Sequence, residues 1–313
     1  MAAAGGALSA VSAGPAAASV KGYSEPGERF IDVPGGRVWA KVTGSGPGVP
    51  LLVLHGGPGA GHDYLEPLAA LADDRPVIFY DQLGCGRSDI PDDSSLWTID
   101  RFLAELEAVR RALGLRRVHL YGHSSGGWLA IEYLAGRPRG VASAVLASTS
   151  ASAAEYSAGT RHLRTRLPKA VQETLDRYEA REDYTATEYQ AAVQVFYDNF
   201  FYRQSPPPEL LLRGLENLQN SHVYPAMWGP NEFVATGSLR NWDRVPALRK
   251  ISTPVLLTRG HYDEFDVRCT NTLQRHLPNA ERADFAASAH FAMLEEQKAY
   301  VSRLRSFLRR LEK

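Results

Sequence analysis

The sequence predicts an α/β protein with a mostly parallel sheet, helices on both faces of that sheet, and an inserted helical segment. Short apolar runs alternate with segments of helical periodicity along most of the chain. This alternation stops between about residues 150 and 249, where only helical periodicity remains. With 313 residues and 44% hydrophobic content, the chain can bury a large core. Alternating strands and helices are typical of parallel sheets with crossover helices.

The expected elements follow from local patterns. Pro34-Gly35-Gly36 separates two β-rich runs and predicts a hairpin, and Gly114 is suited to end the helix before it. Strands are predicted at 29–33, 37–43, 51–54, 77–80, 117–121, 141–147, 254–258 and 280–285, and helices at 98–113, 126–134, 268–276 and the C-terminal end. The insertion is predicted to hold helices at 169–181, 188–202 and 208–220.

Three regions are expected from these patterns. Residues 28–149 and 250–313 should form the α/β core, and residues 150–249 a helical cap. An insertion between two sheet strands should cover the carboxyl edge of the sheet, where open α/β folds bind ligands. Residues 1–27 are expected to be a disordered Ala/Gly/Ser-rich tail, because they lack the basic and strongly apolar regions of a secretory signal.

Composition excludes several functions. Lys plus Arg and Asp plus Glu both number 35, so no basic surplus favours nucleic acid. Cys85 and Cys269 lie far apart without metal-ligand spacing, which argues against a disulfide framework, a metal site or a metal cofactor and favours the reducing cytoplasm. The apolar runs are too short to cross a bilayer, so no membrane partner is expected. Oligomeric state is not indicated.

The stretch VHLYGHSSGGWLA, residues 118–130, predicts a nucleophile on a sharp turn between a strand and a helix. Such a turn leaves little room for side chains two positions before and after the nucleophile. Gly122 and Gly126 flank Ser124 at that distance, whereas His123 would crowd the turn if Ser125 were central. Ser124 is therefore the predicted nucleophile. Patterns typical of phosphate-binding loops are absent here.

A serine nucleophile needs a base and an acid that orients the base, and in this arrangement the chain order is Ser, acid, His. The histidines after Ser124 are His162, His222, His261, His276 and His290. His290 alone lies in the loop between the last strand and the last helix, so it is the predicted base. Asp263 is the predicted acid, with Asp266 as the reserve if it does not serve as a helix N-cap.

Two backbone N–H groups should stabilise a developing oxyanion. One is expected from Ser125, at the start of the helix that follows the nucleophile turn. The other is expected from Gly57 in the loop HGGPG, where Gly56 and Gly57 allow close approach of the backbone to a substrate carbonyl. A tight turn without chemistry is the alternative interpretation of these glycines.

An ordered set of motifs resembles the prolyl aminopeptidase (proline iminopeptidase) family of α/β-hydrolases, most closely its tricorn-interacting aminopeptidase branch. The set is HGGPG, YDQLGCGRS at 80–88, GHSSGG, GHYDE at 260–264 and SAH before the final helix. The resemblance runs from about residue 28 to the C-terminus. It implies an α/β-hydrolase fold with a helical cap, Ser124, Asp263 and His290 as the triad, and Gly57 and Ser125 as oxyanion donors.

The resemblance also implies a substrate site. The cap contains WGPNEF at 228–233, and in such relatives a glutamate of this segment and the glutamate after the triad aspartate hold the free amine of the substrate. Here these are Glu232 and Glu264, with Gly56 and Trp228 as further expected substrate contacts. A helix-start residue and a solvated loop charge are the alternative interpretations of the two glutamates.

One position departs from the family pattern. The residue after the nucleophile is commonly aromatic in the family and is Ser125 here, so Trp128 or the cap aromatics Phe200, Phe201 and Tyr202 are expected to fill the pocket. This change leaves strict preference for proline open. The segment 81–88 is expected to shape a turn at the floor of the site, with Cys85 as a buried small residue rather than a nucleophile.

The predicted function is a serine exopeptidase or amidase that releases an N-terminal proline or small apolar residue, or cleaves amino acid amides, through an acyl-enzyme. An esterase, lactonase or thioesterase acting on a specialised metabolite is the alternative, because fold and triad do not choose the acyl group. A catalytically idle binding protein is a third hypothesis, which an apparently complete triad argues against. Because the nucleophile turn carries serine, the nucleophilic-aspartate chemistry of dehalogenases is also disfavoured.

Overall fold

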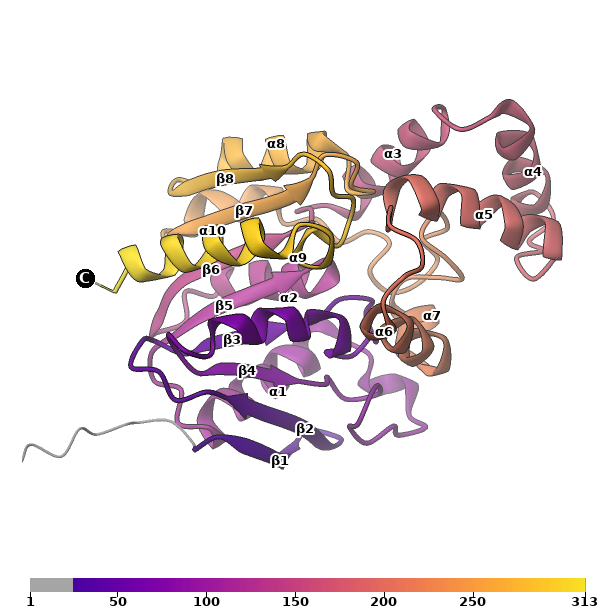
Figure 1. Ribbon diagram of the computed structural model, residues 1–313. Helices are drawn as coiled ribbons and strands as arrows, with labels where there is room; N and C mark the ends of the chain where they lie inside the picture. Colours follow the sequence, from indigo (N-terminus) through magenta and orange to yellow (C-terminus); the bar gives the residue numbers. More distant parts are fainter. Residues whose placement is uncertain (1–24, 313) are drawn as a thin grey trace, which may run out of the picture.

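The computed structural model describes residues 25–312, so the predicted N-terminal tail lies almost wholly outside the described residues. Its centre is a sheet of eight strands in the order β1-β2-β4-β3-β5-β6-β7-β8 (Figure 1). β1 and β2 pair antiparallel, β2 and β4 pair antiparallel, and the other neighbours are parallel. The predicted α/β class with a mostly parallel sheet is confirmed.

The strands and helices lie close to the predicted ranges. The strands are β1 (Gly27–Val33), β2 (Gly36–Thr43), β3 (Leu51–Leu54), β4 (Val77–Tyr80), β5 (Val118–His123), β6 (Val141–Ala147), β7 (Val255–Gly260) and β8 (Ala280–Phe285). The helices packed on the sheet are α1 (Ile99–Ala112), α2 (Ser125–Ala135), α8 (Val267–His276), α9 (Ala292–Glu295) and α10 (Gln297–Arg310), with 3₁₀ helices η1 (Asp63–Leu71), η2 (Ser94–Leu96) and η3 (Val245–Lys250).

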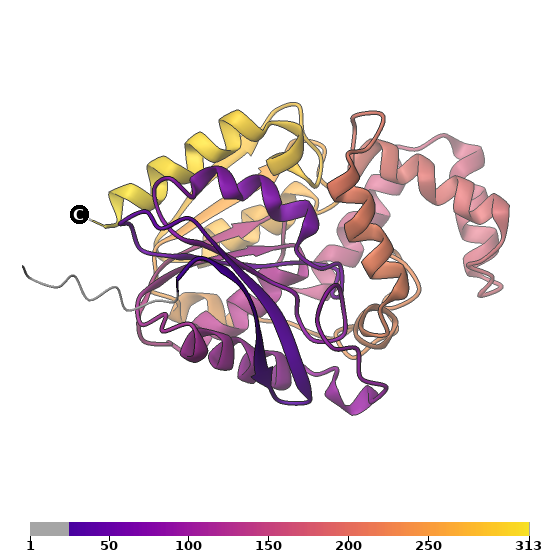
Figure 2. The same cartoon turned by 60° about the horizontal axis from the view of Figure 1, so that its bottom comes forward.

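The central strands divide their side chains between two cores. Successive residues of a strand point to opposite faces, so even and odd positions separate. In β3, Leu52 and Leu54 join the core on the face of α1, α2 and α8, whereas Leu51 and Val53 join the core on the face of η1 and α10. Figure 2 shows α10 and η1 on one side of the sheet and α1 and α2 on the other. Burial on both faces explains why these strands are continuously apolar.

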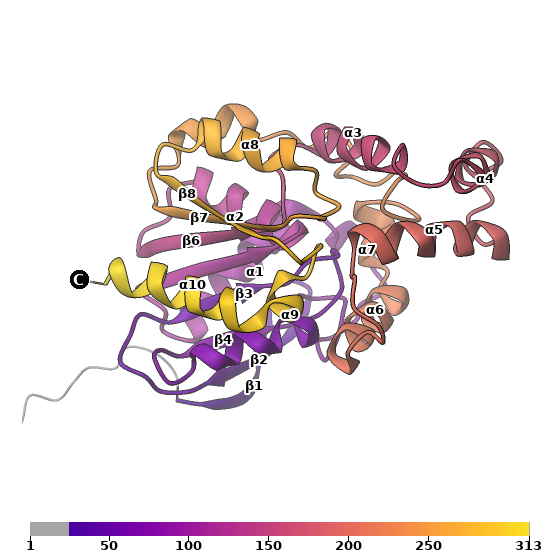
Figure 3. The ribbon, with the colours of Figure 1, turned by 45° about the horizontal axis from the view of Figure 1, so that its top comes forward.

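The segment between β6 and η3 is helical and lies to one side of the sheet, at the carboxyl ends of the parallel strands (Figure 3). Its helices are α3 (Ala153–Arg164), α4 (Lys169–Glu179), α5 (Thr187–Phe200), α6 (Glu209–Asn220) and α7 (Val223–Met227). The predictions for α4, α5 and α6 agree with these bounds within two residues. Helix α3, which packs against α8, and the short helix α7 were not predicted.

Side-chain and backbone caps set the helix ends that matter for the site. Gly114, with φ of 66°, ends the turn after α1, and its N–H donates to Arg111 O. Asp266 caps α8 by accepting a hydrogen bond from Arg268 N at 2.9 Å. Because Asp266 is occupied as a cap, the acid beside His290 has to come from elsewhere on the loop after β7. Within residues 25–312, no helix is long and apolar enough to span a membrane.

Candidate active site

Ser124 occupies a strained turn between β5 and α2. Its φ of 56° and ψ of −126° lie in a region that side-chain-bearing residues rarely adopt. A Cβ at Gly122 would lie 2.4 Å from Gly126 O, and a Cβ at Gly126 would lie 2.3 Å from Leu54 O. The crowding predicted two positions on either side of Ser124 is therefore real, and only glycine fits there.

Asp263 and His290 meet although they are far apart in the sequence. Asp263 Oδ1 lies 2.9 Å from His290 Nδ1, and both side chains are buried. The same Oδ1 accepts a hydrogen bond from Phe265 N at 3.0 Å, which fixes the carboxylate in the loop. Of the predicted acids, Asp263 and not the capping Asp266 therefore contacts the histidine.

The opposite nitrogen of the His290 ring faces the cavity. His290 Nε2 lies 3.6 Å from Glu264 Oε1, and Ser124 and His290 line the same cavity. In the described part of the chain no hydrogen bond joins Ser124 Oγ to His290 Nε2. Hydrogen bonds of this kind are often long or poorly aligned without substrate and tighten when it binds. The aromatic ring of Phe201 stacks on His290 with a centroid distance of 5.5 Å and limits its rotation.

Two backbone N–H groups near Ser124 have no acceptor among residues 25–312. Ser125 is the first residue of α2, so its N–H has no intrahelical partner. Gly57 N–H is likewise unpaired, whereas Gly56 N–H donates to Tyr64 Oη at 2.7 Å. Gly56 is therefore occupied as a donor, and a Cβ on it would lie 2.7 Å from Ser124 Cβ. These contacts leave Gly57 and Ser125 available to an oxyanion.

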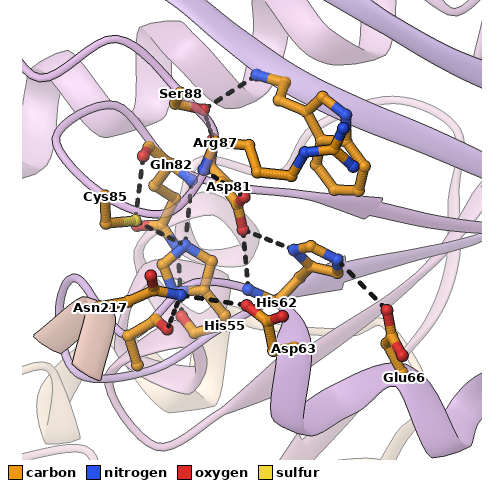
Figure 4. Close-up of polar contacts among 12 residues, drawn as sticks. His55, His62, Asp63, Glu66, Asp81, Gln82, Cys85, Arg87, Ser88 and Asn217 are labelled. Carbon is orange, nitrogen blue, oxygen red and sulfur yellow. Dashed lines mark hydrogen bonds and ion pairs between the residues drawn. The ribbon is translucent and has the colours of Figure 1, made fainter. Parts of the chain in front are cut away.

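The segment 81–88 braces His55, which directly precedes Gly56 and Gly57, as Figure 4 shows for the contacts of His55. Gln82 N–H donates to His55 Nε2 at 3.0 Å, and Gln82 Nε2 donates to His55 O at 3.0 Å. Buried Asp81 accepts hydrogen bonds from His62 N at 2.8 Å and from Arg87 N at 2.9 Å, and its Oδ1 lies 2.7 Å from His62 Nδ1. The structural role predicted for this segment is confirmed.

Cys85 belongs to the same segment and is buried beside His55 Nε2, 3.5 Å away. Burial, followed by the charges of Asp81 and Glu105, raises the pKa of the Cys85 thiol well above its usual value. The sulfur therefore stays protonated and packs as a small apolar group. The described residues contain no cluster of His, Cys, Asp or Glu suited to a metal ion.

Glu264 and Glu232 reach the cavity from two different regions. Glu264 follows Asp263 and is only 1% exposed, and Glu232 follows α7 in the helical segment. Tyr224 and Tyr156 donate to the two oxygens of Glu232 at 2.7 and 2.8 Å. Neither glutamate is a helix-start residue or a solvated loop charge, so both alternative interpretations are wrong.

Burial and proximity perturb both carboxylates. Burial is the largest cause that raises the pKa of Glu264 well above its usual value, and the charges of Glu232 and Asp263 add to it. Burial also raises the pKa of Glu232, although the hydroxyl groups of Tyr224 and Tyr156 oppose that change. Among the described residues, no lysine or arginine pairs with either glutamate. The cavity therefore holds acidic groups whose counter-charge is missing.

Most of the remaining wall of the cavity is apolar, and the polar side chains of Tyr64 and His123 complete it. Phe201, Leu211, Leu215, Leu218 and Phe291 line it together with Ser124, His290 and the two glutamates. Trp228 and Gly56, both expected substrate contacts, do not line it. Trp228 packs behind Tyr156, with ring centroids 5.3 Å apart, and Trp128 stacks on Trp242. Of the aromatic residues expected to compensate for Ser125, Phe201 is the one that lines the cavity.

Comparisons with known proteins agree with this geometry. A family model described as alpha/beta hydrolase fold matches residues 49–297. A proline iminopeptidase of Heyndrickxia coagulans is 42% identical over 282 residues, which cover 90% of this chain and 98% of that protein. The chain belongs to the alpha/beta hydrolase fold family and, within it, to the proline iminopeptidases. It is a hydrolytic enzyme, and its relatives support a serine peptidase that releases an N-terminal residue.

Further relatives support the same family. A proline iminopeptidase of Saccharolobus solfataricus is 38% identical over 82% of this chain and 84% of that protein. The crystal structure of a proline iminopeptidase of Mycobacterium smegmatis gives a TM-score of 0.86 at 33% identity and covers 91% of this chain and 99% of that one. The crystal structure of VinJ gives 0.88 at 32% identity, over 92% of this chain and all of that one. The resemblance inferred from the motifs is confirmed.

Several residues of this iminopeptidase site were not identified from the sequence. Tyr156 and Tyr224 hold Glu232, and Tyr64 contacts both Gly56 N–H and His123. Each comes from a segment without a recognisable motif, so no local signal could have found them. His123 is the exception, because it lies inside the GHSSGG motif next to the nucleophile.

We predict that Asp81→Ala destabilises the protein strongly, by about 3–5 kcal/mol, because His62 would lose a buried partner. Asp81→Asn should cost less, since its amide oxygen can still accept from His62 N. Denaturant unfolding of both variants beside Asp89→Asn, a half-buried aspartate just after this segment that pairs with exposed Arg37, measures the difference. Equal stabilities for the Asp81 and Asp89 variants would contradict a bracing role for Asp81.

Proposed function

We propose that the protein is a serine aminopeptidase that releases an N-terminal residue, proline or another small apolar one, from peptides, or the acyl residue of an amino acid amide. One observation carries the proposal. Ser124 and His290 share a cavity with two carboxylates, Glu232 and Glu264, that have no lysine or arginine partner among residues 25–312. A serine nucleophile beside two carboxylates without a lysine or arginine partner suits a substrate whose reactive carbonyl lies next to a positively charged amine.

In this proposal His290 Nε2 accepts the proton of Ser124 as Oγ attacks the substrate carbonyl. Asp263 keeps the proton on His290 Nδ1 and stabilises the imidazolium that forms. The N–H groups of Gly57 and Ser125 donate to the oxyanion. His290 then protonates the leaving amine, and a water molecule, deprotonated by the same nitrogen, hydrolyses the acyl-enzyme. The 2.9 Å contact between Asp263 and His290 supports these roles.

Glu232 and Glu264 bind the substrate ammonium in this proposal. The two tyrosine hydroxyls favour the ionised form of Glu232 and so oppose the burial that raises its pKa. Glu264 Oε1 lies 3.6 Å from His290 Nε2, so an amine bound by this carboxylate would be close to the reacting carbonyl. A peptide bond at the same position would leave both carboxylates buried without a cation, at considerable cost. This cost explains why the enzyme would act only at the N-terminus.

The apolar wall supports the acyl-residue preference. Phe201, Leu211, Leu218 and Phe291 present hydrocarbon surface and no charge, so a proline ring or small apolar side chain suits the pocket and a charged side chain does not. Ser125 adds no bulk after the nucleophile, which fits a preference wider than proline. We also propose a reducing cytoplasmic setting, because Cys85 and Cys269 are buried free thiols.

A free-amine requirement is the central prediction. Proline arylamide should be cleaved well, and its N-acetylated form very slowly. Glu232→Gln should lower kcat/KM for the free amine by about 10–100-fold, because a hydrogen bond to a charged group contributes about 1.5–3 kcal/mol. Glu216→Gln, which changes an exposed carboxylate on α6, is the matched control. Equal turnover of both substrates would remove the amine site, and turnover of neutral esters alone would favour the esterase alternative.

The raised pKa of Glu264 predicts a pH dependence. Only the ionised carboxyl attracts an ammonium, so KM for free-amine substrates should fall as pH rises through that pKa, until the substrate amine loses its own proton. Because the folded state holds this proton more tightly than the unfolded chain, the stability contributed by Glu264 is present near its ordinary pKa of 4.5 and is lost as pH rises through the folded value. Glu264→Gln should therefore gain Tm relative to the wild type as pH increases. A pH-independent difference in Tm would argue against the perturbed carboxyl.

Asp263 and Asp266 should respond differently to the same substitution. Asp263→Asn should lower kcat by about 10⁴-fold, since the amide would favour the wrong tautomer of His290. Asp266→Asn should retain activity and stability, because asparagine caps helices as well as aspartate does. Steady-state kinetics of the two variants, with labelling of Ser124 by a fluorophosphonate, make the comparison. Loss of activity in Asp266→Asn alone would reverse the assignment.

A further inference from the structure

An unbroken chain of hydrogen bonds runs beneath Ser124 and joins three separate segments. Gly56 N–H donates to Tyr64 Oη at 2.7 Å, Tyr64 Oη lies 3.1 Å from His123 Nδ1, and His123 Nε2 lies 3.0 Å from His290 O. We infer that Tyr64 and His123 are positioning residues that hold the oxyanion loop and the loop of the base in register with the nucleophile. This inference rests on the proposed function.

The direction of every hydrogen bond in the chain is fixed by its ends. A backbone carbonyl can only accept, so His123 Nε2 carries the proton that is donated to His290 O. In a neutral imidazole the other nitrogen is then an acceptor, so Tyr64 donates its hydroxyl proton to His123 Nδ1. The Tyr64 oxygen accepts from Gly56 N–H. No donor faces a donor, and each group in the chain is satisfied.

Burial keeps this arrangement in one protonation state. Tyr64 and His123 are 2% and 1% exposed. Burial, followed by the nearby charge of His290, lowers the pKa of His123 well below its usual value, whereas burial raises the pKa of Tyr64. Both pKa shifts therefore favour the neutral forms of Tyr64 and His123. A protonated His123 would turn Nδ1 into a donor and break the chain at Tyr64.

The three segments that the chain joins are those whose relative position the reaction needs. Gly56 precedes Gly57, the proposed oxyanion donor, His123 precedes Ser124, and His290 is the proposed base. Gly56 and His123 each precede a proposed reacting residue by one position, and His290 takes part only through its main-chain oxygen. These hydrogen bonds, which we call the relay, therefore constrain the backbone and leave the reacting atoms free. The rings of His123 and Tyr64 also pack against Phe291, at centroid distances of 5.4 and 5.3 Å.

The alternative is that Tyr64 and His123 are a buried polar pair with only a structural role. Another buried tyrosine of the protein provides a comparison. Tyr300 Oη lies 2.8 Å from Tyr121 Oη and 2.9 Å from Thr258 Oγ1 in the core on the α10 face. Like Tyr64, Tyr300 makes two hydrogen bonds through its hydroxyl, but among the described residues no hydrogen bond joins it to the loop with Gly56 or to the loop with His290, and it meets β5 at Tyr121, two residues before His123. Tyr300→Phe therefore measures what the loss of a buried tyrosine hydroxyl costs in stability alone.

The test compares kcat and KM for proline arylamide in Tyr64→Phe, His123→Gln, His123→Asn and Tyr300→Phe. Glutamine can still donate toward His290 O but not accept from Tyr64, and asparagine can accept from Tyr64 but not reach His290 O. We expect kcat to fall about 10–100-fold in the Tyr64 and His123 variants, with KM within about twofold, because small misplacements of reacting groups are costly. Tyr300→Phe should lose stability and keep kcat.

A double variant gives a stricter measurement. If the relay acts as a unit, Tyr64→Phe combined with His123→Gln should lower kcat little more than either change alone. Multiplicative losses, or kcat within twofold of wild type in Tyr64→Phe and His123→Gln, would overturn the inference. Ser124→Ala separates this failure from failure of the proposed function: activity retained in Ser124→Ala removes the serine mechanism itself, whereas its loss beside unchanged relay variants removes only the relay.

Wild-type protein provides a readout that does not depend on the folding of any variant. Nitrogen NMR of ¹⁵N-histidine-labelled enzyme, assigned by comparison with His123→Gln or, if that variant does not fold, by through-bond correlation to the labelled backbone, reports the tautomer of His123. We expect a neutral ring protonated on Nε2 between about pH 5 and 9, since the ordinary histidine pKa is about 6.5. A ring protonated on Nδ1, or titrating within this range, would contradict the relay.

Discussion

The backbone of Ser124 is the constraint on which the rest of the site depends. Its positive φ is held because β5 and α2 pack so closely that side chains at Gly122 and Gly126 would clash with Gly126 O and Leu54 O. The carbonyl of Ser124 is also bonded, by Gly127 N at 2.9 Å and Thr149 Oγ1 at 2.7 Å. Strain of this kind persists only where surrounding contacts over-determine it. The turn points the hydroxyl into the cavity and frees the N–H of Ser125.

Around this fixed point the other groups come from loops, and loops need support. The loop with Gly56 and Gly57 is held from below by His55 and Gln82, and from the side by Tyr64. The loop with His290 is tied to the helical segment, since Phe201 O accepts from His290 N at 3.1 Å and Phe200 O accepts from Glu264 N at 2.9 Å. Placement of His290 therefore depends on contacts with the end of α5 as well as on Asp263.

The close packing of these loops also determines the electrostatics of the cavity. Two loops bring Glu264, Glu232 and Asp263 together. Their carboxylates would repel one another if all three were ionised without a cation. The protein partly offsets this cost with the hydroxyls of Tyr156 and Tyr224 on Glu232, while Glu264 Oε2 has no partner among the described residues. An ammonium group would relieve the remaining cost. This clustering of carboxylates, which the tertiary fold creates, is the feature on which the proposed binding of a free N-terminus rests.

The sequence by itself determined the α/β class, most strand and helix positions, the nucleophile turn and the family. These depend on local patterns: apolar runs, glycines at fixed offsets, and motifs whose residues are neighbours in the chain. Tertiary structure decided which acid meets His290, that Trp228 packs behind Tyr156 instead of lining the cavity, and that Tyr64, Tyr156 and Tyr224 belong to the site. Such contacts join residues far apart in the chain, as between His123 and His290, which are separated by 167 positions. No local pattern encodes them, because they form only when separate segments pack against one another.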